Sequence, residues 1–329
     1  SRQLKVPAQK IIDFKIIKKS IDARSKKIVF QLRVQVGIQE NIPITSTEYS
    51  IKKDVSKSPP VIIVGAGPAG LFAALELIEL GLKPIILERG KNVRERRRDL
   101  AAINKKHIVN PESNYCFGEG GAGTYSDGKL YTRSDKRGNV KKVLSIFIEH
   151  GADESIGIDS HPHIGTNKLP KIIVSIREFI IECGGEIHFN TKVENFKIKN
   201  NSITGVESNK GDFITRELIL ATGHSARDIF KKLEKLGIAI ENKPFALGVR
   251  IEHPQSLIDS IQYKCDERGN FLPPASYNLV SQTQFKPAYS FCMCPGGIIA
   301  PCATSPGEVV TNGWSPSKRN NPYANSGIV

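Results

Sequence analysis

The segment Val61–Glu88 constrains the fold of this chain more than any other part of its sequence. Residues 61–64 form a continuous apolar run, which is typical of a strand buried on both faces of a parallel sheet. The motif Gly-Ala-Gly-Pro-Ala-Gly follows at residues 65–70, and a helix is expected over residues 69–81. A second strand is expected over residues 84–87, closed by Glu88. This order predicts an α/β fold with a Rossmann-type domain that binds a dinucleotide.

Each of the three glycines in such a turn has a physical reason. Gly65 allows the tight turn, Gly67 lets the backbone approach the pyrophosphate, and Gly70 lets helix and strand pack closely. The phosphates then face free N–H groups at the positive end of the helix dipole. Glu88 is placed to accept hydrogen bonds from ribose hydroxyls, which favours a ribose without a phosphate. The cofactor contacts expected from this segment are Gly65, Gly67, Pro68, Ala69, Gly70, Glu88 and Arg89.

Two downstream segments favour FAD over NAD as the dinucleotide. The apolar run Ile219–Ala221 ends in Thr222-Gly223, similar to the Ala-Thr-Gly segment that flavoproteins with two dinucleotide sites place beside FAD. The strand expected at residues 186–190 is followed by Val193, which is similar to the valine whose backbone contacts the adenine. Either segment alone is also explained by an ordinary strand and turn. Their order along the chain predicts an FAD site that includes Val193, Thr222 and Gly223.

A glycine-rich loop spans residues 117–130. So many glycines weaken regular structure unless the backbone must approach another group closely. In an FAD protein that group is the pyrophosphate or the flavin edge. We therefore expect Gly120 and Gly121 to approach the cofactor, and Ser126 and Lys129 to donate hydrogen bonds to it. The alternative is a flexible surface loop.

Histidines and cysteines supply the candidates for further chemistry. His163, in His161-Pro162-His163, is placed as a proton donor or a binding group for a substrate anion, or lies in a solvated turn. Cys292 and Cys294 form a Cys-x-Cys pair, which has three interpretations: a redox-active pair beside the flavin, a zinc site with Cys302, or a packed structural turn. No fourth zinc ligand stands at a suitable spacing, so no metal site is expected.

The net charge of +14 is unevenly distributed along the chain. Residues 1–57 hold 13 Lys or Arg and 5 Asp or Glu, and therefore 8 of the 14 net charges. A basic segment of this kind is a candidate docking surface for nucleic acid, but its lysines are scattered and match no nucleic-acid motif, so a solvated face is favoured. No signal peptide, membrane span or disulfide pattern is visible, which predicts a cytoplasmic protein.

The sequence divides into four regions. Residues 1–57 alternate in hydropathy, as in Phe30, Leu32 and Val34, and predict a small basic α+β or β-rich module with one half-buried sheet face. Residues 58–240 form the FAD-binding domain, with an inserted loop and helical region at about 100–165. Residues 241–312 are expected to form a β-rich substrate or cap layer. Residues 313–329 begin the return to the FAD domain.

Several segments together resemble one family. They are Val61–Gly70, Phe117–Leu130, His163–Leu169, Gly248–Pro254, Ser290–Gly297 and Gly313–Asn325. They are similar to the bacterial FAD-dependent dehydrogenases also called NAD(FAD)-utilising dehydrogenases, within the glutathione-reductase-like flavoproteins. The resemblance implies an FAD-dependent oxidoreductase with a small-molecule substrate that it does not name. NAD(P)H is then a candidate electron donor.

Three further expectations concern the substrate side, the end of the sequence and an alternative function. Arg250, His253 and His163 are the candidates on the substrate side, beside the two cysteines of the Cys-x-Cys pair. Such flavoproteins return to the FAD domain after the substrate layer, and the sequence stops near that point, so we expect it to be truncated and to hold FAD weakly. The alternative function is a flavin-dependent protein that binds or modifies nucleic acid and docks through the basic N-terminal module.

Overall fold

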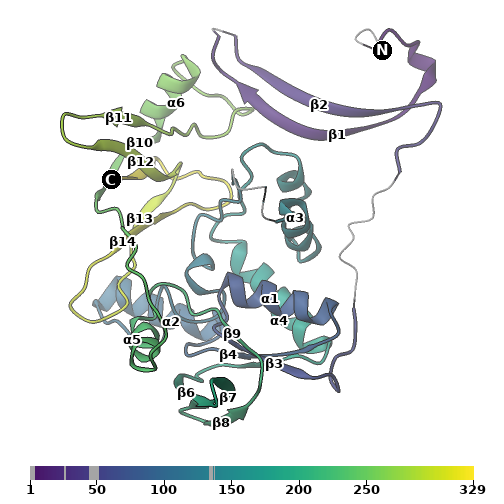
Figure 1. Ribbon diagram of the computed structural model, residues 1–329. Helices are drawn as coiled ribbons and strands as arrows, with labels where there is room; N and C mark the ends of the chain where they lie inside the picture. Colours follow the sequence, from purple (N-terminus) through teal and green to yellow (C-terminus); the bar gives the residue numbers. More distant parts are fainter. Residues whose placement is uncertain (1–3, 26, 44–51, 133–135, 137) are drawn as a thin grey trace.

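A computed structural model describes residues 4–25, 27–43, 52–132, 136 and 138–329. Its centre is a parallel sheet with the strand order β5-β4-β3-β9, which Figure 1 shows beneath helices α1 and α4. The strands are β3 (Pro60–Val64), β4 (Lys83–Leu87), β5 (Glu186–His188) and β9 (Leu218–Leu220). The sheet confirms the predicted α/β fold with a Rossmann-type domain.

The two faces of this sheet carry different layers because successive strand residues point to opposite sides. Ile63 faces α1 (Pro68–Glu79) and α4 (Leu169–Glu182), and packs in one core with Leu75 and Ile176. Ile62 and Val64 face the other way, into a second core. That core is covered by α5 (Arg227–Lys235) and by the antiparallel strands β6 (Val193–Lys199), β7 (Ser202–Ser208) and β8 (Gly211–Ile214).

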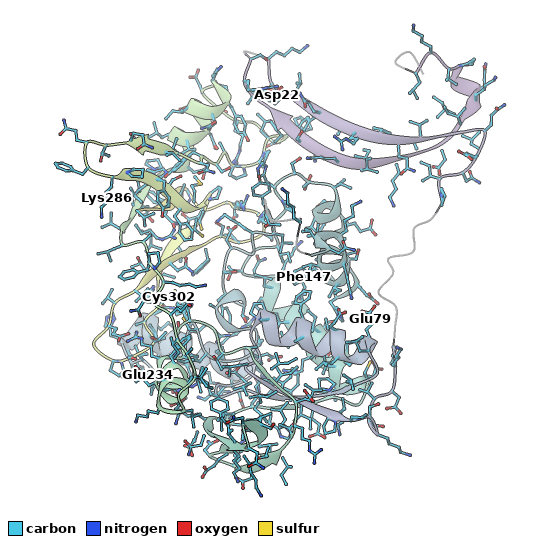
Figure 2. All side chains as sticks on the ribbon, viewed as in Figure 1. Asp22, Glu79, Phe147, Glu234, Lys286 and Cys302 are labelled. Atoms are coloured by element: carbon cyan, nitrogen blue, oxygen red, sulfur yellow. The ribbon has the colours of Figure 1, made fainter. Side chains whose placement is uncertain are left out.

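The region between β4 and β5 contains two further helices, α2 (Val93–Lys106) and α3 (Val140–Glu149). Helix α2 is capped by Asn92, whose side chain accepts a hydrogen bond from the Glu95 N–H at 3.1 Å. Phe147 of α3, labelled in Figure 2, packs edge-to-face on Phe72 of α1 with ring centroids 5.4 Å apart. Single 3₁₀ turns lie at Ala8–Lys10, Gly121–Gly123 and Glu154–Gly157.

The C-terminal region is built from antiparallel sheets. The larger sheet has the order β10-β15-β12-β11, and a smaller one pairs β13 with β14. Their bounds are β10 (Val249–Pro254), β11 (Val280–Gln282), β12 (Pro287–Cys294), β13 (Ile298–Pro301), β14 (Thr311–Trp314) and β15 (Tyr323–Ile328). Helix α6 (Gln255–Tyr263) follows β10 directly. This region has the β-rich character expected of the substrate layer.

The N-terminal region is a long antiparallel hairpin of β1 (Ile11–Asp22) and β2 (Val29–Ile38), drawn across the top of Figure 1. The strands alternate as predicted, but the apolar face is less buried than expected: Phe14 is 68% exposed and Leu32 is 51% exposed. A two-stranded hairpin has no third layer of its own to cover one face. Its end near Ile21 and Ile28 packs on the rest of the molecule.

Within the described ranges, no helix combines the length and the apolar character needed to cross a membrane.

Candidate functional site

A pocket of about 420 Å³ lies at the carboxyl ends of β3, β4 and β9, where α1 begins. This is the position at which open α/β sheets bind their ligands. Its walls come from parts of the chain that are far apart in sequence. The lining residues include Gly65, Gly67, Pro68, Ala69, Glu88, Arg89, Cys116, Phe117, Gly121, Thr191, Lys192, Val193, Thr222, Gly223 and Asp228.

The three motif glycines meet different surroundings, in agreement with the roles expected of them. A Cβ atom on Gly65, which has φ +108°, would come within 2.6 Å of the Ala221 carbonyl oxygen. A Cβ on Gly70 would collide with the Gly65 carbonyl oxygen. A Cβ on Gly67 would meet only the Gly121 Cα, at 4.0 Å, and would otherwise extend into the open pocket. Gly67 therefore leaves room for a ligand, whereas the other two glycines allow the chain to pack on itself.

The Glu88 carboxylate is buried and holds three backbone segments together. Its Oε2 accepts from Ala66 N at 2.7 Å, and its Oε1 accepts from Gly90 N at 2.8 Å and from Gly118 N at 3.0 Å. The sequence predicted hydrogen bonds to ribose but not this structural role. Glu88 also lines the pocket, so its expected contact with a ribose stays a prediction.

Arg89 and Lys192 line the pocket but are already paired with acidic side chains. Arg89 donates to Glu112 at 2.6 Å and to Asp228 at 3.0 Å, with its guanidinium 4.3 Å from the Phe117 ring centroid. Lys192 donates to the same Glu112 at 2.6 Å. Burial lowers the pKa of Arg89, but its two carboxylate partners outweigh burial and raise the pKa, so this pocket wall remains cationic.

The glycine-rich loop is a buried, hydrogen-bonded structure and not the flexible surface loop that was the alternative. Arg96 of α2 is fully buried and donates five hydrogen bonds of 2.7–3.2 Å, three to the loop and two to Asn114 and Tyr115 before it. The acceptors are the carbonyls of Asn114, Tyr115, Glu119 and Gly121 and the hydroxyl of Thr124. These contacts hold Gly121 against the pocket wall.

Glu119 forms the second buried charge of this loop. Its carboxylate accepts from Val93 N at 2.7 Å and from Arg177 at 2.9 Å. Burial raises the pKa of this carboxyl, although Arg177 and Arg96 oppose the shift. Gly120, the next residue, has φ +75° and donates its N–H to the Ala66 carbonyl at 2.8 Å. The loop is thereby attached directly to the Gly65–Gly70 turn.

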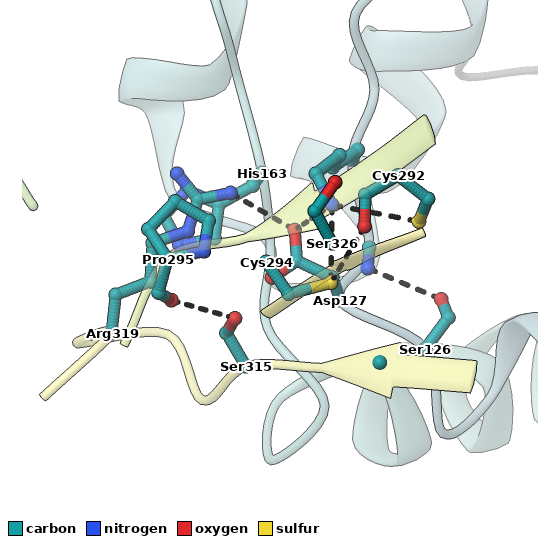
Figure 3. Close-up of polar contacts among 12 residues, drawn as sticks. Ser126, Asp127, His163, Cys292, Cys294, Pro295, Ser315, Arg319 and Ser326 are labelled. Carbon is teal, nitrogen blue, oxygen red and sulfur yellow. Dashed lines mark hydrogen bonds and ion pairs between the residues drawn. The ribbon is translucent and has the colours of Figure 1, made fainter. Parts of the chain in front are cut away.

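A second polar cluster lies at the other end of the same loop (Figure 3). Lys129 places its Nζ 3.4 Å from the Cys294 sulfur and 3.7 Å from the Cys292 sulfur. The same Nζ lies 3.5 Å from the Asp127 carboxylate, which also accepts from Arg319 at 2.9 Å. Burial raises the pKa of Asp127, but Arg319 and Lys129 outweigh it and hold the pKa low. The cluster therefore combines fixed charges with two thiols.

His163 belongs to this cluster as a neutral group. Burial and the positive charge of Arg319 lower its pKa to about 4, and its Nε2 lies 3.1 Å from the Ser317 carbonyl oxygen. At neutral pH the ring nitrogen therefore donates a hydrogen bond to that carbonyl. Because the ring is uncharged at that pH, His163 does not suit the role of an anion-binding cation that the sequence suggested.

The low pKa of His163 predicts a pH-dependent stability. In the unfolded chain this histidine has a pKa of about 6.5 and binds a proton at a pH where the folded state leaves it neutral. The free energy of unfolding therefore falls as the pH drops from about 6.5 towards 4. This histidine should account for about 2 kcal/mol of the loss between pH 7 and pH 5. Urea unfolding at both pH values should show a smaller loss for His163→Gln, which still donates to Ser317. An equal loss in both proteins would contradict the assignment.

The remaining candidates are only partly brought together. Arg250 lies near the thiols: its Nη1 donates to the Cys292 carbonyl at 3.4 Å and to the Asn325 side chain at 2.5 Å. His253 faces Tyr277 instead, with ring centroids 5.5 Å apart. Among the expected cofactor contacts, four do not line the pocket, namely Gly70, Gly120, Ser126 and Lys129.

Sequence reasoning missed several residues that shape both clusters. Thr191 and Cys116 line the pocket, and Arg96, Glu119, Asp127 and Arg319 fix the loop and the thiols. Glu119 and Asp127 lie inside the glycine-rich loop, so a charged residue among so many glycines was an available signal. In the part of the chain that the structure describes, no group of three His, Cys, Asp or Glu side chains could hold a metal ion.

Three family matches cover separate parts of the chain. Residues 58–212 match the family described as "FAD binding domain", and residues 244–329 match "FAD-dependent protein, C-terminal domain-like". Residues 1–37 match a domain of unknown function. The first match includes Gly67, Glu88 and Val193 of the pocket, and the second includes Cys292 and Cys294.

Curated relatives share a large part of the sequence. A protein of Clostridium beijerinckii described as "Uncharacterized protein" is 38% identical over 100% of this chain and 64% of its own length. Protein FixC of Escherichia coli K12 is 30% identical over 60% of this chain and 44% of its own length. The chain thus spans less than two thirds of either relative.

Solved structures superpose only weakly. L-proline dehydrogenase from P. horikoshii has a TM-score of 0.32 and 15% identity, covering 59% of both chains. Glycine oxidase from Bacillus cereus has a TM-score of 0.30 and 17% identity, covering 55% of this chain and 59% of its own.

Proposed function

We propose that this chain transfers hydride or electrons through a bound flavin. It belongs among the FAD-dependent proteins, because residues 58–212 match an FAD binding domain and residues 244–329 match the C-terminal domain of FAD-dependent proteins. The reaction is that of an oxidoreductase acting on a small-molecule substrate. The observation that carries the proposal is the open space in front of Gly67, in the pocket at the start of α1.

The described residues fit the dinucleotide part of FAD. The pyrophosphate suits the N-terminus of α1, where Gly67 exposes the backbone and the helix dipole is positive. Val193 and Thr191 line the pocket beyond Glu88 and suit the adenosine, while Gly121 and Thr222 suit the remainder of the cofactor. When bound, the flavin supplies the capacity to accept electrons from a substrate and pass them on.

The protein contributes positioning and electrostatics around this group. Arg89 keeps a cation beside the pocket, and its pairing with Glu112 and Asp228 fixes the orientation of the guanidinium. Arg96 fixes the glycine-rich loop against the same pocket.

Flavin binding is the first test of this proposal. Titrating the purified chain into FAD should quench the flavin fluorescence and shift the visible absorption bands, and equilibrium dialysis should show binding to one site per chain. Riboflavin lacks the pyrophosphate and adenosine, so it should bind much more weakly. Equal affinity for riboflavin and FAD would show that the pocket at α1 does not hold the dinucleotide.

NAD(P)H is the proposed electron donor to the flavin. Mixing the FAD-loaded chain anaerobically with NADH or NADPH should bleach the flavin absorbance near its visible maximum, with one nucleotide oxidised per flavin. Photoreduction of the same sample provides the control for a flavin that can be reduced. Bleaching by light but by neither nucleotide would require another donor.

A further inference from the structure

The Cys-x-Cys pair of β12 presents both sulfurs to one side of the strand. Residues two apart in a strand face the same way, and the residue between them faces the opposite way. Met293 is 5% exposed and packs in a core with Ile258 and Ala324. Cys292 and Cys294 face Lys129, whose Nζ contacts both sulfurs at 3.7 and 3.4 Å. One cation therefore serves two thiols.

The backbone at Cys292 is held in an unusual conformation. Its φ is +50°, in the left-handed region that side chains other than glycine rarely adopt. The pairing of β12 with β15 also shifts register between Phe291 and Cys294. Such strain persists only where the surrounding structure enforces it, and it is concentrated at functional sites. The Arg250 hydrogen bond to the Cys292 carbonyl is one of the contacts that enforce it.

The two thiols differ in access. Cys292 is half-buried, whereas Cys294 is fully buried. A reagent from solvent therefore reaches Cys292 first, and Cys294 lies behind it, with its sulfur 3.4 Å from the Cys292 carbonyl oxygen. This order of access matches an attacking thiol in front of a resolving thiol.

The charges around the pair distinguish the two thiols in the same way. The hydrogen bond from Cys294, with Lys129 and Arg250, lowers the pKa of Cys292 well below that of an ordinary thiol, although burial opposes the shift. The bond to Cys292 and burial raise the pKa of Cys294. Asp127, Arg319 and the neutral His163 complete the set of titratable groups at this position.

We propose that Cys292 and Cys294 form a redox-active dithiol that reduces disulfide bonds, with Cys292 as the attacking thiolate and Cys294 as the resolving thiol. Neither the family matches nor the relatives assign a role to this pair. The proposal does not depend on a bound flavin, because both thiols, Lys129 and Arg250 belong to the chain itself.

The reaction proceeds in two exchanges. The Cys292 thiolate attacks one sulfur of a small disulfide, forming a mixed disulfide and releasing the other half as a thiolate, which takes a proton from solvent. The Cys294 thiol then loses its proton and attacks the Cys292 sulfur, releasing the second half as a thiol. One disulfide has become two thiols, and the protein dithiol has become a disulfide. The two electrons pass from the protein to the small molecule.

Lys129 suits this sequence because it touches both sulfurs. Burial lowers the pKa of Lys129, but Asp127 and the two sulfurs outweigh burial and raise the pKa. The ammonium group therefore remains charged next to the Cys292 thiolate. It also lies beside Cys294 when that thiol must ionise for the second exchange, so Lys129 acts as a positioning residue for both steps.

The first test is the pH profile of alkylation in the unmodified chain. Iodoacetamide labelling, resolved by peptide mass spectrometry, should proceed at Cys292 at least about tenfold faster than at Cys302 at pH 6. Cys302 is also half-buried, but burial raises its pKa to about 12, which makes it an internal control. The Cys292 rate should reach its plateau below pH 7. A rate that keeps rising tenfold per pH unit through pH 8 would overturn the assignment of Cys292 as the thiolate.

The second test uses 2-hydroxyethyl disulfide as the oxidant. The unmodified chain should end with a Cys292–Cys294 disulfide and release two equivalents of thiol, whereas Cys294→Ser should stop at a stable mixed disulfide on Cys292. Serine can still donate the hydrogen bond to Cys292, so the first step is retained. A mixed disulfide that also persists in the unmodified chain, or no reaction at either cysteine, would overturn the proposal even if the variant does not fold.

Replacing Lys129 tests the role of the cation. Lys129→Met should move the alkylation plateau of Cys292 to higher pH, while Lys106→Met, an exposed lysine on α2, should leave it in place. Lys129→Arg keeps the charge and should restore most of the shift. Identical profiles for Lys129→Met and the unmodified chain would exclude Lys129 from the dithiol site.

Discussion

An Arg96→Met variant is expected to lose about 3–5 kcal/mol of unfolding free energy, a large fraction of the stability of a domain. The side chain is fully buried, and its removal leaves five acceptors between residues 114 and 124 without their donor. Methionine fills similar space but donates no hydrogen bond. Urea unfolding followed by circular dichroism would measure the loss.

The matched control is Arg98→Met, an exposed arginine on the same helix. It removes the same charge and should change the unfolding free energy by no more than about 0.5 kcal/mol. If the two variants unfold at the same urea concentration, the five hydrogen bonds do not hold the loop in solution. If Arg96→Met is less stable than Arg98→Met only after FAD is added, Arg96 instead supports the binding pocket.

A Gly67→Val variant should fold normally yet bind FAD about tenfold to a hundredfold more weakly, or not at all. The added Cβ points into the open pocket, since outside the adjoining residues its nearest atom is the Gly121 Cα at 4.0 Å. It would therefore displace the ligand from the backbone N–H groups, and each lost hydrogen bond to a charged oxygen costs about 1.5–3 kcal/mol. Fluorescence titration with FAD provides the affinity.

Gly138→Ala is the control for this variant, because a Cβ at that position meets no atom of the described residues within 4 Å and lies away from the pocket. Both proteins should unfold at nearly the same urea concentration, and only Gly67→Val should lose affinity. Normal FAD binding by Gly67→Val would falsify the assignment of this pocket to the dinucleotide.

The sequence predicted the parts of the site that depend on local pattern. An apolar run, three glycines at fixed spacing and a second apolar run determine a strand, a turn and a helix through contacts between near neighbours. For that reason Gly65, Gly67 and Glu88 were placed at the pocket before the structure was known, and Val193 and Thr222 were placed there by their order along the chain. Each of these residues lies next to the end of a strand that the hydropathy pattern identifies.

Long-range contacts were not predictable in the same way. Helix α2 contains four arginines within five residues, and Arg96 shares the helix face of the apolar Val93, Leu100 and Ile103, but no local pattern indicates which acceptors it meets. Lys129 was assigned to the cofactor, but it contacts sulfurs more than 160 residues away in the chain. That contact depends on how the loop crosses β12, which is a property of the folded chain and not of any local pattern.

The pairing of β3 with β9 has a consequence for when the pocket can form during synthesis. Ile62 pairs with Leu218, so one wall of the pocket is made early and the opposite wall only after residues 65–217 have been added. At about 5–20 residues per second, this interval is on the order of ten seconds. The nascent chain must therefore hold the β9 side of strand β3 unpaired for that time, although β4 pairs with its other side, and the cofactor can assist folding only once β9 has been added.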